Sequence, residues 1–425
     1  MKNKMPDDES PVASRVRRHR RHGLLAAAAA ALLAAAFAGC LRDPPPEPEP
    51  NYYNTPLPFK SLTAAEDQVA KMVAKWAALS GRPSPELDPG LTYACRALSR
   101  AVAHGGPKAF DEFTNAALQK ELLRFGVADS SLRTQMASAV HVSGVESRLG
   151  TGIMNELAEG RYTNFGVGET FAWWPPLHYV VLVFSRRPVR LDPFPRNVGI
   201  GEAVEVSGEL LEGLRRPIVY ISDPAGNVHE PLVHLRSDGS FRANIFFNDP
   251  GIYRIEVGGD SSLGPEVAAL MPVNVGGVAD EAEAAGPAPQ EDSEEKAKAL
   301  VLREINRERR AAGLSAVSLY APLARVAQGH ADEMRRLKYA AHASPTTGMA
   351  ADRATAAGIR WQRITENVAV NQSALAAHAS LMESPGHRAN VLDGEVGCAG
   401  IGVAFADDGH GHRLVYLVEN YVALQ

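Results

Sequence analysis

Cysteine is scarce in this sequence: its 425 residues contain three, Cys40, Cys95 and Cys398. No two of them have the CxxC spacing of a zinc or redox site, and so few thiols cannot build a disulfide framework. Two interpretations stay open for Cys95 and Cys398, one long-range bridge or two separate thiols in the core. The scarcity excludes a small scaffold stapled by disulfides, so the fold must rest on hydrophobic burial.

Positive charge is also in short supply. The formal net charge is −5, and residues 1–39 hold seven Lys/Arg against three Asp/Glu, so removing them takes −5 to −9. Proteins that bind DNA or RNA are generally basic, because they neutralise phosphates. We therefore expect no nucleic-acid partner.

Long hydrophobic runs are missing too. The Ala/Leu run Leu24–Ala38 is shorter than the roughly 20 residues that cross a bilayer, and it follows a basic stretch at 15–22. This pattern is typical of a signal peptide, here residues 1–39. The segment ends in Phe37-Ala38-Gly39-Cys40, which resembles the bacterial lipobox and implies lipidation of Cys40. An uncleaved anchor is the alternative; either way we expect export, with the membrane as a partner.

Two biased segments divide the rest of the chain. Five prolines lie between positions 44 and 50, which predicts an extended tether over 40–58. Residues 277–293 are acidic and rich in Ala, Pro and Gly, which predicts a linker that buries little apolar surface. With a further change of pattern near 195, the predicted domains are 59–194, 195–276 and 294–425.

Residues 195–276 lose the helical period. Short runs such as VEVSGEL, PIVYI and SFRANIFF alternate with turn sequences such as Asp223-Pro224-Ala225-Gly226. Strands at this spacing predict an antiparallel β-sandwich. The stretch from Gly251 to Val257 resembles bacterial immunoglobulin-like modules, and the segment has no charge cluster or nucleophile. A spacer is the expected role.

Residues 294–425 carry the most informative patterns. We expect a helix over 295–312 ended by Gly313, a second from near Pro322, and a third over 373–383. The second helix should run on to a break at Pro345, and Leu375, Ala379 and Met382 should face inward in the third. Two alternating strands, 399–406 and 414–422, close the chain around a His-rich turn. The second helix has one apolar stripe, formed by Leu323, Val326, Ala327, His330, Ala331 and Met334. On that stripe His330 is expected to be a core histidine.

The order of short motifs here resembles the CAP superfamily of cysteine-rich secretory, antigen 5 and pathogenesis-related proteins. The motifs are INxxR, HAxxM, HASP, TENVA, SPGHRANVL and GIGVAF, in consistent order from 295 to 422. The resemblance implies an α-β-α sandwich with a groove across one face. With the other segments, the expected fold class is α+β and multidomain.

The resemblance also implies a site. Larger members of the superfamily carry two histidines and two glutamates in the groove. By motif position the histidines are His342 and His387, and one glutamate is Glu366, although Thr365 replaces the usual glycine. Ser384 stands where the second glutamate would be. The remaining expected groove residues are Ser344 and Arg388.

The residue types allow three chemistries. Neutral imidazoles of His342 and His387 could hold a divalent metal such as zinc. With Glu366 they could act as acid and base in a hydrolase. A buried hydrogen-bonded network that orders the loops would select the same residues. Ser344 and Ser384 are expected in local turns rather than as nucleophiles, and His410 and His412 in a solvated turn or an adventitious metal site.

The SPGHR motif also predicts local structure. Ser384-Pro385-Gly386 should end the third helix, with Gly386 permitting a return turn that places His387 at the rim of the groove. Arg388 and Asn390 are expected to pin this loop through hydrogen bonds.

Residues 59–194 look like a degraded copy of the same plan. A helical pattern at Val69, Met72, Val73 and Trp76 comes first, and FGVGE and YVVLVF at the end match IGVAF and LVYLVE. Nothing in this copy corresponds to HASP, TEN or SPGHR. It is expected to keep the scaffold without the site.

Together these features predict an exported, lipid-anchored envelope protein, in the outer membrane or periplasm or at the cell surface. Its C-terminal domain would bind a lipid, glycan or peptide. A metal-assisted hydrolase and a structural protein with a vestigial groove are the alternatives.

Overall fold

The structure is a computed structural model that describes residues 47–105, 115–173, 175–278, 291–407 and 413–425. Residues 48–425 form one compact unit. The predicted signal peptide, Cys40, His410 and His412 lie outside the described residues. Within the described part, no helix combines the length and the apolar character needed to cross a membrane.

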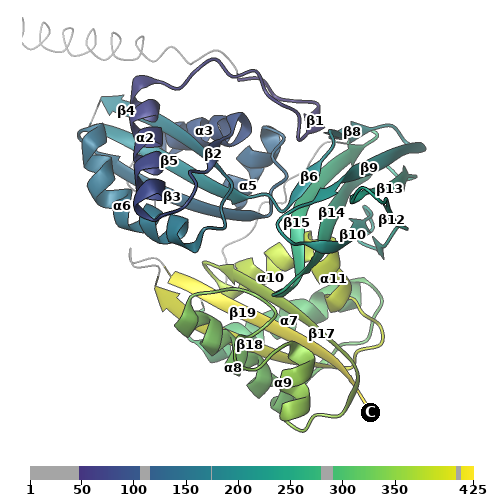
Figure 1. Cartoon of the computed structure of the whole chain (residues 1–425). Coiled ribbons are helices and arrows are strands. Elements are labelled where there is room, and N and C mark those ends of the chain that lie inside the picture. The colour runs from purple at the N-terminus through teal and green to yellow at the C-terminus, as the bar shows by residue number, and fades with distance from the viewer. Residues whose placement is uncertain (1–46, 106–114, 174, 279–290, 408–412) are drawn as a thin grey trace, which may run out of the picture. The chain divides into compact units, whose positions relative to one another are not determined.

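The C-terminal domain is an α-β-α sandwich, as the sequence predicted (Figure 1). Helices α7 and α10 cover one face of a four-stranded sheet, and α8 and α9 cover the other. The sheet order is β16-β18-β19-β17, with β16 parallel to β18 and the other neighbours antiparallel. In chain order the elements are α7 (Glu294–Ala311), β16 (Ser318–Leu319), α8 (Ala321–Leu337), α9 (Ala350–Ala356), β17 (Trp361–Asn371), α10 (Ala374–Glu383), α11 (Pro385–Val391), β18 (Cys398–Asp407) and β19 (Arg413–Leu424).

The N-terminal domain repeats this topology. Its sheet order is β2-β4-β5-β3, again with the short edge strand parallel to its neighbour. Helices α3 and α5 pack on one face, and α2 and α6 pack on the other. The elements are α2 (Ala64–Leu79), β2 (Glu86–Leu87), α3 (Pro89–Gly105), α5 (Asn115–Arg124), β3 (Ser131–Ala139), α6 (Val142–Glu159), β4 (Asn164–Trp173) and β5 (Pro176–Arg186).

Paired glycines show that the two copies share more than strand order. A Cβ on Gly400 or Gly402 would come within 3.0 Å of the backbone of α8, at Leu323 and Ala327. Gly166 and Gly168 of β4 meet the backbone of α3 in the same way. In both copies a helix therefore packs directly on the strand, which only glycine allows. This supports the predicted internal repeat.

The middle segment is a two-sheet β-sandwich around one hydrophobic core, which confirms that part of the predicted fold. One sheet has the order β11-β10-β14-β15-β8 and the other β12-β13-β9-β6. The immunoglobulin-like relationship stays a prediction. The strands are β6 (Val189–Leu191), β7 (Phe194–Pro195), β8 (Asn197–Val198), β9 (Glu202–Leu210), β10 (Arg215–Ser222), β11 (Val228–His229), β12 (His234–Leu235), β13 (Ser240–Phe247), β14 (Gly251–Ser261) and β15 (Gly264–Val275).

The structure places parts of both predicted linkers inside folded units. In the proline-rich segment, β1 (Tyr52–Tyr53) pairs with β7, and Tyr53 is buried in the sandwich core. At the end of the acidic segment, the buried carboxylate of Glu291 accepts hydrogen bonds from the backbone N–H groups of Ala374 and Leu375. An extended tether to 58 and a free linker to 293 are therefore wrong at these residues. Composition missed them because aromatic burial and helix capping depend on distant partners.

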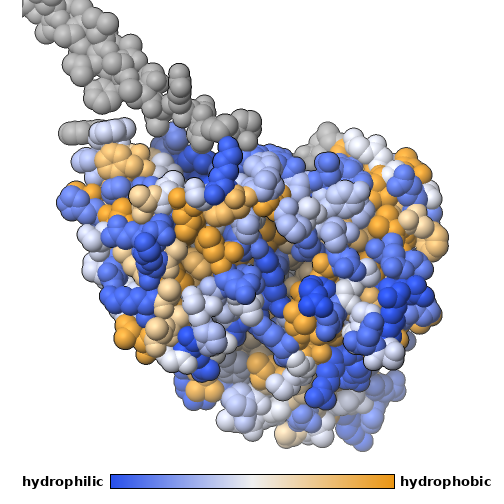
Figure 2. Space-filling model, turned by 45° about the horizontal axis from the view of Figure 1, so that its top comes forward, coloured by the Kyte–Doolittle hydropathy of each residue, from blue (hydrophilic) through white to orange (hydrophobic). Residues whose placement is uncertain are grey.

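One further prediction fails within the third helix of the C-terminal domain. Ala379 is exposed rather than inward, and Leu375 is only half-buried. The buried face instead holds Ala377, His378 and Leu381. Ala and Ser make up half of this helix, so its apolar pattern does not define a single buried face. The face of the molecule shown in Figure 2 mixes hydrophobic and hydrophilic residues.

Candidate functional site

His342 lies in the loop that follows α8. The helix ends earlier than predicted, because Lys338 adopts a left-handed conformation (φ 57°) and its N–H bonds to the carbonyl of Met334. The loop is then ordered by Ser344, whose hydroxyl accepts hydrogen bonds from the backbone N–H groups of Thr346 and Thr347. Ser344 thus forms the local turn expected of it. His342 is held beside this turn with its side chain largely buried.

His387 lies on a short helix and not on a return turn. Proline at 385 begins α11 directly after Ser384, and Gly386 lies in its first turn with an ordinary negative φ. The predicted glycine turn is therefore wrong. Proline suits the first turn of a helix, where its missing N–H has no partner to lose. The backbone of His387 is therefore held within a helix and not in a loop.

The structure brings His342, Glu366 and His387 together. The Nδ1 atom of His342 lies 3.1 Å from Oε1 of Glu366, which β17 supplies. The two imidazole rings lie nearly parallel, with centroids 6.5 Å apart and an interplanar angle of 22°. Nδ1 of His387 lies 2.6 Å from the hydroxyl oxygen of Ser384. Three residues from motifs far apart in sequence thus form one cluster.

Arg353 of α9 is a member of this cluster that the sequence did not reveal. Its guanidinium is buried, pairs with the carboxylate of Glu366, and donates to the carbonyl oxygens of His342 (3.1 Å) and Gly348. It therefore joins the His342 loop to β17. Its one sequence signal is a charged residue in a short helix, which is too common to single out.

Arg388 and Asn390 hold α11 in different ways. Asn390 Nδ2 donates to Oδ1 of Asn367 (2.9 Å) and to the carbonyl of Glu366, so it pins α11 to β17 as predicted. Arg388 donates from Nε to the carbonyl of Gly226, in the β10–β11 turn of the sandwich, at 2.9 Å. Arg388 is therefore a contact to the sandwich, whereas it was expected in the groove.

The electrostatics favour a neutral His387. Burial and the neighbouring imidazole of His342 lower the pKa of His387 to about 4. A neutral imidazole at 387 can offer either a hydrogen-bond donor or an acceptor.

His330 is a core histidine, as predicted: it is 1% exposed and one ring nitrogen lies 2.9 Å from the carbonyl of Ala341.

The residues do not fit a metal site with three protein ligands. His342 and His387 provide two imidazoles, but Glu366 is engaged by Arg353. Among the described residues, no three His, Cys, Asp or Glu side chains are grouped so that they could hold a metal ion.

The comparison with protein families agrees with the fold of the C-terminal domain. Residues 302–421 match the family model described as CAP, the cysteine-rich secretory protein family. The C-terminal domain of this chain is a CAP domain. No curated protein matches the chain.

Solved structures similar to this chain include two proteins of SCP or cysteine-rich secretory type. An extracellular protein containing a SCP domain from Bacillus anthracis is 18% identical, covering 56% of this chain and 76% of that one, with a TM-score of 0.27. A cysteine-rich secretory protein from Staphylococcus aureus is 12% identical over 52% and 76%, with a TM-score of 0.25. An outer surface protein from Borrelia burgdorferi is 13% identical over 32% and 100%, with a TM-score of 0.28.

Proposed function

We propose that this chain is an exported, lipid-anchored cell-envelope protein whose CAP domain binds a glycan or peptide of the envelope. The observation that carries the proposal is the pairing of His342 and His387. Each ring is restrained at Nδ1, by Glu366 and by Ser384 respectively. The other ring nitrogen, Nε2, has no hydrogen-bonding partner among the described residues in either histidine, and we propose that the ligand supplies one.

The chemistry of the cluster favours a polar ligand. The Nε2 nitrogens of two imidazoles recognise hydroxyl and amide groups, which glycans and peptides carry in quantity. A lipid chain would need an apolar lining instead. Hydrolysis with His342 and His387 as acid and base is less well supported, because the carboxylate of Glu366, which would orient the water, is engaged by His342 and Arg353.

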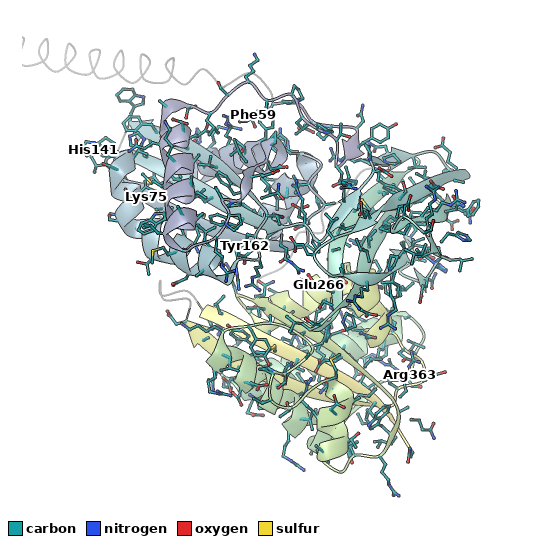
Figure 3. All side chains as sticks on the ribbon, viewed as in Figure 1. Phe59, Lys75, His141, Tyr162, Glu266 and Arg363 are labelled. Carbon is teal, nitrogen blue, oxygen red and sulfur yellow. The ribbon has the colours of Figure 1, made fainter. Side chains whose placement is uncertain are left out.

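Binding is tested by sedimentation of the full chain, purified in detergent, with isolated peptidoglycan sacculi. We expect the wild type to cosediment and the double variant His342→Ala/His387→Ala to lose at least about tenfold in affinity, since both restrained imidazoles are removed. The matched control is His141→Ala/His234→Ala, which removes two exposed histidines; His141 is labelled at the surface in Figure 3. Failure of the wild type to sediment, or equal sedimentation of wild type and double variant, would contradict the proposal.

The lipid anchor is tested separately. Cells expressing the chain are fed a radiolabelled fatty acid, and we expect label in the wild type and none in Cys40→Ser. Export is scored in the same cells by adding protease after the outer layer of the envelope is opened and while the inner membrane stays intact. An exported protein is digested under these conditions. Label that persists in Cys40→Ser would contradict anchoring at this residue.

A further inference from the structure

Glu256 of β14 is a buried carboxylate with no cationic partner among the described residues. It is 4% exposed. Its hydrogen bonds come from the hydroxyl of Ser384 and, at 3.4 Å, from the backbone N–H of Gly386. The other buried glutamates around the CAP sheet have cations or imidazoles, Arg353 for Glu366 and His378 for Glu419. An unpaired buried carboxylate is costly, so its position calls for a role.

The carboxylate reaches the candidate site through a short hydrogen-bonded chain. Oε2 of Glu256 contacts the hydroxyl of Ser384, and that oxygen lies 2.6 Å from Nδ1 of His387. Gly386 makes the approach possible, because a Cβ there would lie 2.5 Å from Oε1 of Glu256 and 3.1 Å from the ring of Tyr220. The sandwich thus places a carboxylate behind His387, as Glu366 stands behind His342.

The chain has two self-consistent arrangements, because the Ser384 hydroxyl has one proton. When Glu256 is ionised, Ser384 donates to it, so the serine oxygen accepts from Nδ1–H and Nε2 of His387 carries a lone pair. When Glu256 is protonated, it donates to Ser384, which then donates to Nδ1, so the proton of His387 lies on Nε2. One proton is taken up from solvent in total, and the imidazole stays neutral in both arrangements.

We propose that Glu256 is a positioning residue of the CAP site and that its protonation selects the tautomer of His387 through Ser384. The site is then built by two modules, the sandwich and the CAP domain. Resting on the proposed function, this also sets the ligand chemistry. His387 presents a donor to a carbonyl when Glu256 is protonated, and an acceptor to a hydroxyl or amide when it is ionised.

The surroundings place this change near neutral pH. Burial raises the pKa of Glu256 to about 7, against the opposing hydrogen bonds from Ser384 and Gly386. His387 does not interfere, because its own pKa lies at about 4. Three neighbouring elements carry titratable or charged groups near Glu256. The groups are Tyr220 of β10, Arg254 of β14, and His387 and Arg388 of α11. The guanidinium of Arg254 is paired with Glu383.

The test reads the tautomer directly, whether or not a ligand is known. Histidine-labelled full chain is examined by long-range proton–nitrogen NMR at about pH 5.5 and about pH 8.5, on either side of the expected change. The His387 resonances are assigned with His387→Gln. In the wild type we expect Nε2–H at the lower pH and Nδ1–H at the higher. Glu256→Gln and Ser384→Ala should each hold one tautomer at both values.

The matched control is Glu205→Gln, which removes an exposed carboxylate from β9 of the same sandwich and should behave as wild type. A wild-type His387 with the same tautomer at both pH values would overturn the proposal, and so would a Glu256→Gln variant that still switches. Glu256→Gln keeps the shape of the side chain, and near-ultraviolet circular dichroism verifies its fold. Failure of sacculus binding with an intact tautomer change would contradict the proposed function alone.

Discussion

Glu366 of β17 and Thr134 of β3 occupy the same place in two copies of one fold. In the C-terminal sheet Asn420 pairs with both Gly400 and Glu366, and in the N-terminal sheet Val183 pairs with both Gly166 and Thr134. Because Gly400 and Gly166 make the same approach to a helix, the two registers correspond. The first copy therefore keeps the backbone plan and lacks the site carboxylate.

The glycine approach predicts a local sensitivity. Gly400→Ala should destabilise the CAP domain by about 1 to 3 kcal/mol, because the added Cβ meets the backbone of Leu323 and the helix must move. Urea denaturation measures the change. The control is Gly397→Ala, where nothing lies within 4 Å of the new Cβ and the change should be below about 1 kcal/mol. Equal effects at the two positions would contradict the close packing.

Removing the charge of Glu366 should be costly. Glu366→Gln leaves the buried guanidinium of Arg353 without its counter-charge, and we expect a loss of about 3 to 5 kcal/mol. Lys75→Gln is the control. Lys75, labelled in Figure 3, pairs with Glu146, and the two side chains are 59% and 33% exposed. The control should cost no more than about 1 kcal/mol. Denaturant unfolding compares the two, and a small effect at Glu366 would mean that Arg353 finds another partner.

Glu256 predicts a pH dependence of stability. Its pKa is raised from 4.5 to about 7 by burial, so between these values the folded chain holds more protons than the unfolded chain. The free energy of unfolding should therefore fall as pH rises from about 4.5 to about 7, by about 3 kcal/mol from this group, and then level off. Glu256→Gln should remove that part of the slope. Identical pH profiles for variant and wild type, measured by thermal unfolding, would contradict the burial of an uncompensated charge.

The two cysteines of the folded part predict different reactivity. Both are free thiols, so the long-range bridge left open by the sequence is absent from the described residues. Cys95 is fully buried and burial raises its pKa, whereas Cys398 is partly exposed. A thiol reagent should therefore label Cys398 in the native protein and Cys95 only after unfolding. Peptide mapping by mass spectrometry locates the label, and early labelling of Cys95 would contradict its burial.

Local sequence was a good guide where the signal was local. The helix of Glu294–Ala311, its glycine end at Gly313, and the strand patterns around Gly400 follow from periodicity and turn chemistry. Helix ends were less secure. Lys338 takes a left-handed conformation that no residue type announces, and Pro385 begins a helix where a turn was expected. The tertiary contacts of Tyr53 and Glu291 lay beyond any compositional argument.

The sequence by itself indicated a CAP-type C-terminal domain, its α-β-α plan, and the association of His342, Glu366 and His387, because its ordered motifs resemble those of a family in which these positions converge. Only the tertiary structure decided what stands behind the imidazoles. Arg353 pairs with Glu366, which is 13 residues away along the chain. Glu256 contacts Ser384, which is 128 residues away. Burial, pairing and proton affinity depend on those spatial neighbours, and residue order along the chain does not specify them.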